Sequence, residues 1–127
     1  MQVERLDHLV LTVADVATTI RFYTSVLGME EITFGEGRKA LAFGQQKINL
    51  HAASQPLLPH ATTPAPGSAD LCFIVDDNIQ AFLSHLRTHA VPIEQGPVAR
   101  TGALGPILSV YFRDPDDNLL ELSTYDR

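Results

Sequence analysis

Hydrophobic and polar residues alternate at the start of the chain, over the segment Leu6–Val13. Leu9, Leu11 and Val13 fall on one face of an extended chain, and His8 falls on the opposite face. The two faces differ in polarity, which is typical of a strand that lies between two different environments. The segment therefore predicts a β-strand with one face toward a core.

The next segment follows a helical period. Asp15 stands where an N-cap residue is expected, and Gly28 can end a helix in the left-handed conformation. The apolar residues between them recur at spacings of four, three and four: Val16, Ile20, Tyr23 and Leu27. This pattern predicts an amphipathic helix of about three turns.

Three short strands should follow the helix, because glycine-containing turns separate three apolar segments. These segments are Glu30–Phe34, Lys39–Phe43 and Lys47–Ala52. Residues 5–53 thus form a predicted βαβββ module. Residues 54–68 contain four of the eight prolines of the chain and are interpreted as a linker, since a helix or a central strand is hard to build there.

The second half repeats this order over residues 69–125. Asp76 and Asp77 are expected to cap its helix, whose apolar stripe is Ile79, Phe82, Leu83 and Leu86. Its predicted strands are Asp70–Val75, Ile93–Pro97, Ile107–Phe112 and Leu119–Ser123. The prediction is therefore a single α+β domain of two βαβββ modules, which form a cup-shaped mixed sheet.

A constant offset between the halves supports an internal repeat. His8 maps onto Asp70 with an offset of 62, as Val13 maps onto Val75, and Asn49 maps onto Glu121 with an offset of 72. Longer loops in the second half account for the larger offset. Chance recurrence of a βαβββ pattern is the alternative, because few residues are identical between the halves.

Composition narrows the function classes. The 127 residues carry a net charge of −6 without a basic block, which argues against a nucleic-acid partner. No apolar run has the roughly 18 to 20 residues of a membrane span, and the first residues do not resemble a secretory signal. A single cysteine, Cys72, favours a reducing compartment, so we expect a cytoplasmic protein without a membrane partner.

Polar residues gather where the repeat places the inner faces of the two sheets. His8, Asp70 and Glu121 all point to that side by strand alternation, and unpaired burial of such groups is costly. A divalent metal would balance them, and His51, on the same strand face as Asn49, could be a fourth ligand. The alternatives are a hydrogen-bonded strand histidine, a solvent-facing edge glutamate and a turn-capping aspartate.

Two further residues are candidates for binding a substrate. Arg100 lies in the glycine-rich segment Val98–Pro106, which either closes over a cavity to hold an anion or is a flexible hairpin loop. Ser109, on the next strand, is expected to face the same cavity. His85 and His89 have metal-ligand spacing on the second helix, but the apolar stripe turns them toward solvent.

Three segments of the sequence resemble the glyoxalase/bleomycin-resistance/extradiol-dioxygenase superfamily, also called vicinal oxygen chelate. They are Asp7-His8 in LDHLVLTV, RFYTSVLGM at 21–29 and FRDPDDNLLEL at 112–122. RKALAFGQQKINLH at 38–51, PGSAD at 66–70 and residues 100–123 further resemble the subgroup of virulence-associated and glyoxalase-domain-containing (type 5) proteins. The resemblance covers essentially the whole chain.

The resemblance implies a cup around a divalent metal, in a homodimer. By position, His8 and Glu121 match the first and last metal ligands of the family. Asp70 stands where glyoxalase I and the dioxygenases usually have a histidine, and Asn49 stands where glyoxalase I has a glutamate. These two departures count against lactoylglutathione lyase activity and against a ring-cleaving iron triad.

The resemblance also implies a reaction class. The family's metal binds two adjacent oxygens of a small-molecule substrate and stabilises an enediolate-like anion, in lyases, isomerases and dioxygenases. Glu121 would then carry a proton, with Arg100, Ser109 and Asn49 binding the substrate. Zn, Ni, Mn and Fe(II) all suit mixed nitrogen and oxygen ligands. The alternatives are a metal-free binding protein of the bleomycin-resistance type and a degenerate relative kept for protein interaction.

Overall fold

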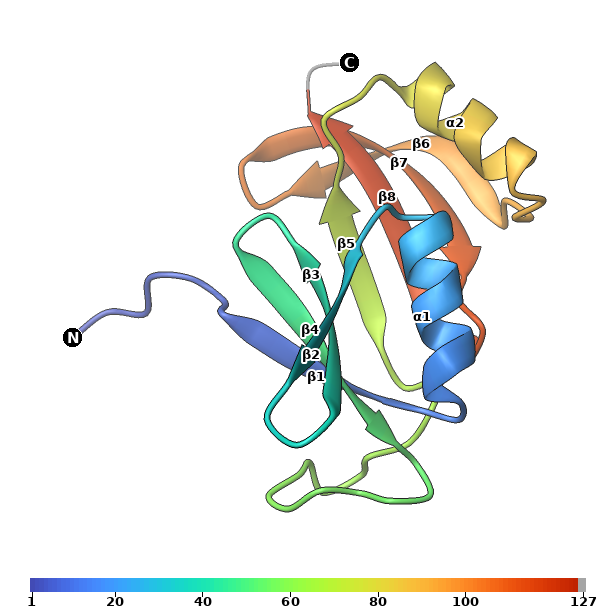
Figure 1. The fold of residues 1–127 in the computed structure, drawn as a ribbon. Coiled ribbons are helices and arrows are strands. Elements are labelled where there is room, and N and C mark those ends of the chain that lie inside the picture. Colours follow the sequence, from blue (N-terminus) through green and yellow to red (C-terminus); the bar gives the residue numbers. More distant parts are fainter. Residues whose placement is uncertain (126–127) are drawn as a thin grey trace. The chain divides into compact units, whose positions relative to one another are not determined.

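The computed structural model describes residues 1–125 and divides the chain into two compact units, which meet in sequence between Gly67 and Ser68. Each unit contains one helix and one four-stranded mixed sheet (Figure 1). Both units have the element order βαβββ. The predicted α+β fold with two βαβββ modules is therefore confirmed.

The first unit forms a sheet of strand order β1-β4-β3-β2. Strand β1 runs parallel to β4, and the other neighbours are antiparallel. The elements agree with the sequence prediction to within one or two residues: β1 (His8–Val13), α1 (Val16–Ser25), β2 (Glu30–Phe34), β3 (Arg38–Phe43) and β4 (Gln46–Ala52). The parallel pair becomes possible because α1, β2 and β3 together carry the chain back to the start of β1.

Helix α1 begins and ends as the sequence predicts. The Asp15 side chain accepts a hydrogen bond from the Thr18 backbone N–H at 3.2 Å, and Gly28 adopts a φ of +67° beyond the last turn. The buried stripe is rotated from the expected one, since Thr19 and Tyr23 are buried while Val16 is only half-buried. Thr19 tolerates burial because its hydroxyl group donates to the Asp15 carbonyl oxygen.

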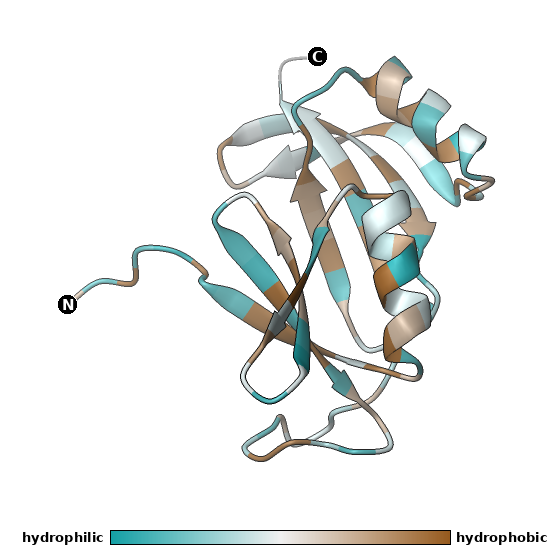
Figure 2. Cartoon of the chain, viewed as in Figure 1, coloured by the Kyte–Doolittle hydropathy of each residue, from teal (hydrophilic) through white to brown (hydrophobic). Residues whose placement is uncertain are grey.

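The second unit has the equivalent strand order β5-β8-β7-β6, with β5 parallel to β8. Its elements are β5 (Asp70–Ile74), α2 (Ile79–Thr88), β6 (Gln95–Gly102), β7 (Gly105–Arg113) and β8 (Leu119–Tyr125). All four residues of the predicted apolar stripe of α2 are buried, and polar positions alternate with apolar ones along both helices (Figure 2).

No helix within residues 1–125 is both long enough and apolar enough to cross a membrane.

The cap of α2 differs from the prediction. Asn78, rather than Asp76 or Asp77, is the N-cap, and its side-chain oxygen accepts from the Ala81 N–H at 2.9 Å. Asp77 instead accepts from the Asn78 N–H. Any of these three side chains can cap a helix, so the sequence identified the helix start but not the residue that caps it.

The glycine-rich segment near Arg100 is a strand and not a loop. Strand β6 extends to Gly102 and pairs with β7 through a two-residue turn, so that Arg100 lies opposite Ile107. The predicted strand Ile93–Pro97 was therefore placed too early. Gly105, the first residue after this turn, has a φ of +130°, a conformation that glycine adopts without the steric cost of a side chain.

The strand registers reproduce the predicted repeat. Val10 pairs with Asn49 in the first sheet, and Cys72 pairs with Glu121 in the second. These pairs are related by the same offsets, 62 and 72, that align the two halves of the sequence. Asn49 and Glu121 therefore occupy equivalent positions in their own sheets.

Candidate functional site

The predicted site residues lie on one face of each sheet. In the first unit this face is opposite to the one that carries the buried Leu11 and Val13, and it presents His8, Asn49 and His51. In the second unit the corresponding face presents Asp70, Arg100, Ser109 and Glu121. Strand alternation thus places every predicted site residue on the expected face of its own sheet.

Glu121, in the middle of β8, is held by two serine side chains. The hydroxyl group of Ser109 donates to Oε2 of Glu121 at 2.6 Å, and that of Ser123 lies 3.4 Å from the same oxygen. Both serines are fully buried, and their hydroxyl oxygens are 2.7 Å apart. These contacts fix one carboxylate oxygen, so that the other, Oε1, is the one that can bind a ligand.

Glu121 and Arg100 line the same cavity of the second unit, which has a volume of about 320 Å³. The Arg100 Nε donates to the hydroxyl group of Tyr111 at 2.9 Å, and the guanidinium carbon lies 5.5 Å from the centre of that ring. Since Tyr111 does not neutralise the guanidinium charge, Arg100 can bind an anionic group inside the cavity.

Cys72 belongs to the same cavity wall and pairs with Glu121 across the two strands. Its sulfur lies 3.4 Å from the hydroxyl oxygen of Ser123. Cys72 is exposed by its total surface, but desolvation of the thiol raises its pKa, and the negative charges of Glu121 and Asp70 raise the pKa further. The thiol is therefore protonated at neutral pH and adds a weakly polar surface to the cavity.

His8 is positioned by the residue before it. Its Nδ1 donates to Oδ2 of Asp7 at 2.8 Å, and this hydrogen bond lowers the pKa of the Asp7 carboxyl group. The other nitrogen of the exposed His8 ring, Nε2, is then the one left to bind a metal ion. Metal-binding histidines typically have this arrangement, in which a carboxylate orients the ring through the other nitrogen.

Asp70, the first residue of β5, is exposed on the same sheet face as Glu121. It pairs with Leu119, so Glu121 is two positions further along the neighbouring strand. This diagonal separates the two Cα atoms by roughly 8 Å, a distance that two carboxylates can bridge to one cation. As donors, one imidazole and two carboxylates fit a divalent ion of the zinc, nickel, manganese or iron type.

His51 is far from His8 on the first sheet. His8 pairs with Lys47, whereas His51 is four residues further along β4, which corresponds to roughly 13 Å along the strand. This register disfavours His51 as a fourth ligand beside His8. Within residues 1–125, no three histidine, cysteine, aspartate or glutamate side chains are brought together in a group that could hold a metal ion.

His51 and Asn49 are both buried, with 6% and 5% of their surfaces exposed. His51 Nε2 and Asn49 Oδ1 have no hydrogen-bond partner among residues 1–125. Burial lowers the pKa of His51, and the charges of Arg38 and His60 lower it further. The His51 ring is therefore neutral at physiological pH and carries an unused polar atom.

Acidification should destabilise the protein through His51. Because its pKa is lower in the folded chain than the ordinary value of 6.5, the unfolded chain binds more protons as the pH falls below about 6.5. We expect the wild type to lose more unfolding free energy between pH 7.5 and pH 5.5 than His51→Gln, as measured by urea denaturation. Equal losses in the two proteins would contradict this pKa shift.

Two residues of these sites escaped the sequence analysis. Tyr111, which holds Arg100, pairs with Glu121 across β7 and β8, and strand alternation could have indicated it. His60 lines a cavity with His51 in the first unit. No sequence signal pointed to His60, because the proline-rich segment around it has no period. His85 and His89 are exposed on α2, as predicted.

Comparison with known proteins identifies the relatives of the chain. The glyoxalase domain-containing protein RDO1 of Mycosarcoma maydis is 55% identical over 98% of this chain and 70% of its own length. The virulence protein STM3117 of Salmonella typhimurium is 54% identical over 98% of this chain and 87% of its own length. Its crystal structure matches with a TM-score of 0.97, over 98% of this chain and 99% of that chain.

The name of a more distant relative refers to a metal. The metallothiol transferase FosB of Staphylococcus epidermidis is 26% identical over 98% of this chain and 84% of its own length. The model of the glyoxalase/bleomycin resistance protein/dioxygenase superfamily matches residues 5–122, which is nearly the whole chain. The chain therefore belongs to the glyoxalase/bleomycin resistance protein/dioxygenase superfamily.

Proposed function

We propose that the protein is a divalent-metal-dependent enzyme that acts on a small, oxygen-rich, anionic substrate. The observation that carries this proposal is that Glu121 and Arg100 line the same cavity of the second unit. A carboxylate that can bind a cation or a proton and a guanidinium that can bind an anion are the two charges such chemistry needs. The distant metallothiol transferase supports a metal-dependent reaction.

His8, Asp70 and Glu121 are the metal ligands in this proposal. His8 is oriented by Asp7, and Glu121 by Ser109, so both ligands are fixed through their second polar atom. When bound, the ion would supply Lewis-acid stabilisation of negative charge on the substrate oxygens. Zinc, nickel, manganese and iron(II) all suit this mixed set of nitrogen and oxygen ligands.

The chain's own residues would do the remaining work. Arg100 holds the anionic group of the substrate, and Tyr111 keeps the guanidinium in the cavity. Glu121 would have two duties that alternate, metal ligand and proton carrier, and both would use Oε1 because Ser109 occupies the other oxygen. In the homologous position of the first unit, Asn49 cannot accept a proton, so we assign it to substrate binding and not to proton transfer.

Metal content tests this proposal most directly. We expect near-stoichiometric metal in protein purified without chelator, measured by inductively coupled plasma mass spectrometry. His8→Ala and Glu121→Ala should each lower the affinity for the metal at least tenfold, because each removes one ligand. His85→Ala, which removes an exposed histidine of α2, is the matched control and should retain the metal.

The same measurement distinguishes the proposal from binding without chemistry. A wild type that remains empty after dialysis against nickel, zinc, manganese and iron(II) would overturn the metal-dependent reaction and favour a protein that only sequesters a ligand. If metal is bound, 2-oxoaldehydes with thiols, and catechols, are the first substrates to test. Glu121→Gln should then abolish turnover, and full activity of this variant would exclude Glu121 as the proton carrier.

A further inference from the structure

Two histidines lie next to each other on the exposed side of helix α2. His85 and His89 are four residues apart, so their side chains are on one side of the helix, one turn apart. Both residues are exposed, because the apolar stripe of the helix is the side that is buried. The centres of the two rings are 4.3 Å apart, with an angle of 42° between the ring planes. The two imidazoles are therefore neighbours at a surface that the proposed reaction does not use.

The end of the helix holds the ring of His89 in one orientation. His89 is the C-cap of α2, and its backbone N–H donates to the His85 carbonyl oxygen at 3.1 Å. Its Nδ1 lies 2.9 Å from the same oxygen, and because a carbonyl oxygen only accepts, this nitrogen carries the proton. Nε2 of the neutral ring then has the lone pair. Metal-binding histidines are commonly oriented in this way, by a backbone carbonyl group on the other ring nitrogen.

The separation of the rings suits one shared ion. A transition-metal ion binds imidazole nitrogen at about 2.0–2.1 Å, so two rings on adjacent coordination positions would have centres roughly 4.5–5 Å apart. The observed 4.3 Å is slightly shorter, and a small rotation of the exposed His85 side chain would reach this range. Water would fill the other positions, since within residues 1–125 these two histidines belong to no group of three potential ligands.

The electrostatic surroundings favour a cation. The last turn of a helix has a partial negative charge from its carbonyl groups, and His85 and His89 lie at that end of α2. Arg87 comes between them in the sequence, but residues two apart on a helix do not face each other, so Arg87 is on another side. The net charge of −6 also attracts cations to the protein.

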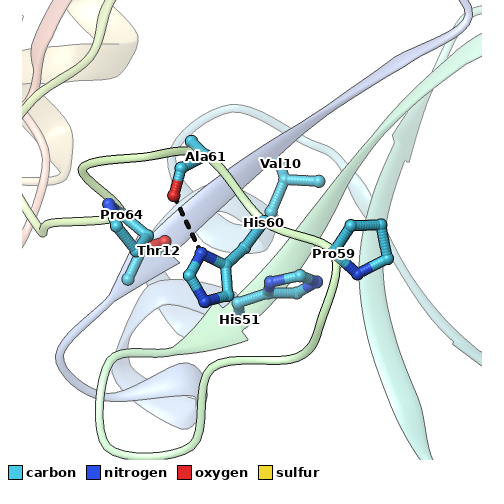
Figure 3. Close-up of a pocket in the computed structure, with 7 residues that line it drawn as sticks. All are labelled: Val10, Thr12, His51, Pro59, His60, Ala61 and Pro64. Carbon is cyan, nitrogen blue, oxygen red and sulfur yellow. Dashed lines mark hydrogen bonds between the residues drawn. The ribbon is translucent and has the colours of Figure 1, made fainter.

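A second pair of histidines shows why exposure matters. His51 and His60 line one cavity of the first unit, where their rings lie close together (Figure 3). Nε2 of His51, however, is a buried atom that an ion in this cavity does not reach. The exposed rings of His85 and His89 have no such barrier.

We propose that His85 and His89 form a second metal site, which binds copper(II), nickel or zinc through two imidazole nitrogens. Imidazole suits these three ions, and copper(II) should bind most tightly of the three. The site is on α2, whereas the ligands of the proposed reaction are on β1, β5 and β8. With two protein ligands instead of three, it should lose its ion first on dialysis into metal-free buffer. His85→Ala therefore remains a valid control for the metal that purified protein retains.

A copper(II) titration of the whole protein, followed by NMR, tests the proposal. Paramagnetic copper(II) broadens the signals of nearby nuclei, so the broadened signals locate the ion. We expect saturable broadening of the amide signals of residues 85–90 and of the ring signals of His85 and His89. Broadening confined to β1, β5 and β8 would overturn the second site and leave the proposed function intact. Broadening confined to α2 would support the second site alone.

Variants at exposed positions test the spacing of the two rings. His85→Ala and His89→Ala should each lower the affinity of α2 for copper(II) at least tenfold, because each leaves a single imidazole. His60→Ala also removes an exposed histidine and, as the matched control, should keep the wild-type affinity. Combining Ser84→His with His85→Ala keeps two histidines but places them five residues apart, on different sides of the helix. This double variant should bind as weakly as His85→Ala, and wild-type affinity in either would overturn the shared site.

Discussion

Replacing Asp114 by alanine is expected to lower the free energy of unfolding by about 4 kcal/mol. Asp114 is 4% exposed and lies in the turn between β7 and β8. Its Oδ1 accepts from the backbone N–H groups of Asp116 and Asn118, each at 2.9 Å, and its Oδ2 accepts from the Asn118 side chain at 2.8 Å. Alanine would leave three donors without this acceptor, two of them on the fully buried Asn118.

Urea denaturation followed by circular dichroism measures this effect, with Asp117→Asn as the matched control. Asp117 lies in the same turn with a φ of +65°, a conformation that asparagine also tolerates, and its side chain is exposed. The control removes the same charge and should change stability by less than about 0.5 kcal/mol. Similar losses in both variants would show that charge, and not the hydrogen-bond network, stabilises the turn.

The turn also positions the candidate site. The side-chain oxygen of Asn118 accepts from the Ala69 N–H at 2.9 Å, and the Leu119 N–H donates to the Ala69 carbonyl oxygen. These bonds fix the start of β5, where Asp70 follows, against the start of β8, which leads to Glu121. The segment FRDPDDNLLEL, which carries much of the family resemblance, is therefore in large part a structural device that aligns two candidate ligands.

Strand alternation made much of the fold predictable. The period of two along Leu6–Val13 placed His8 away from the core, and the offsets of 62 and 72 placed Asn49 and Glu121 at equivalent positions. These predictions succeeded because a one-residue error in register would turn every side chain to the wrong face. Burial of one sheet face thus constrains the strand register strongly, and the alternation of apolar and polar residues in the sequence indicates that register.

Other features depend on contacts that a single sequence does not encode locally. The extension of β6 through Arg100 comes from pairing with β7, so a segment with the composition of a loop became a strand. His60 lines a cavity together with His51 because the proline-rich segment returns over that residue. The distance between His8 and His51 likewise follows from the parallel pairing of β1 with β4, which their spacing in sequence does not reveal.

Gly96→Ala is expected to cost about 3 kcal/mol or more of unfolding free energy. A Cβ atom at Gly96 would lie 2.5 Å from the backbone oxygen of Ser109 and 2.9 Å from Cα of Val110. Both are backbone atoms of β7 and cannot move as a flexible side chain would. Gly96 also has a φ of +112°, which L side chains rarely adopt, so the variant is strained by conformation and by contact.

Gly105→Ala separates these two causes. Gly105 has a φ of +130°, but a Cβ atom there would meet nothing within 4 Å. This variant should lose only the conformational part, about 1–2 kcal/mol, in the same denaturation experiment. If Gly105→Ala is as destabilising as Gly96→Ala, the contact with β7 contributes nothing and backbone conformation alone explains both losses.

The contact at Gly96 also connects stability to the site. Relief of the clash would push β6 away from Ser109, whose hydroxyl group holds Oε2 of Glu121 at 2.6 Å. Under conditions where both variants are fully folded, Gly96→Ala should therefore bind the metal more weakly than Gly105→Ala. Gly96 is not itself a proposed ligand, but it determines how closely β6 approaches β7. Through that approach it would set the orientation of the Glu121 carboxylate, on which the proposed reaction depends.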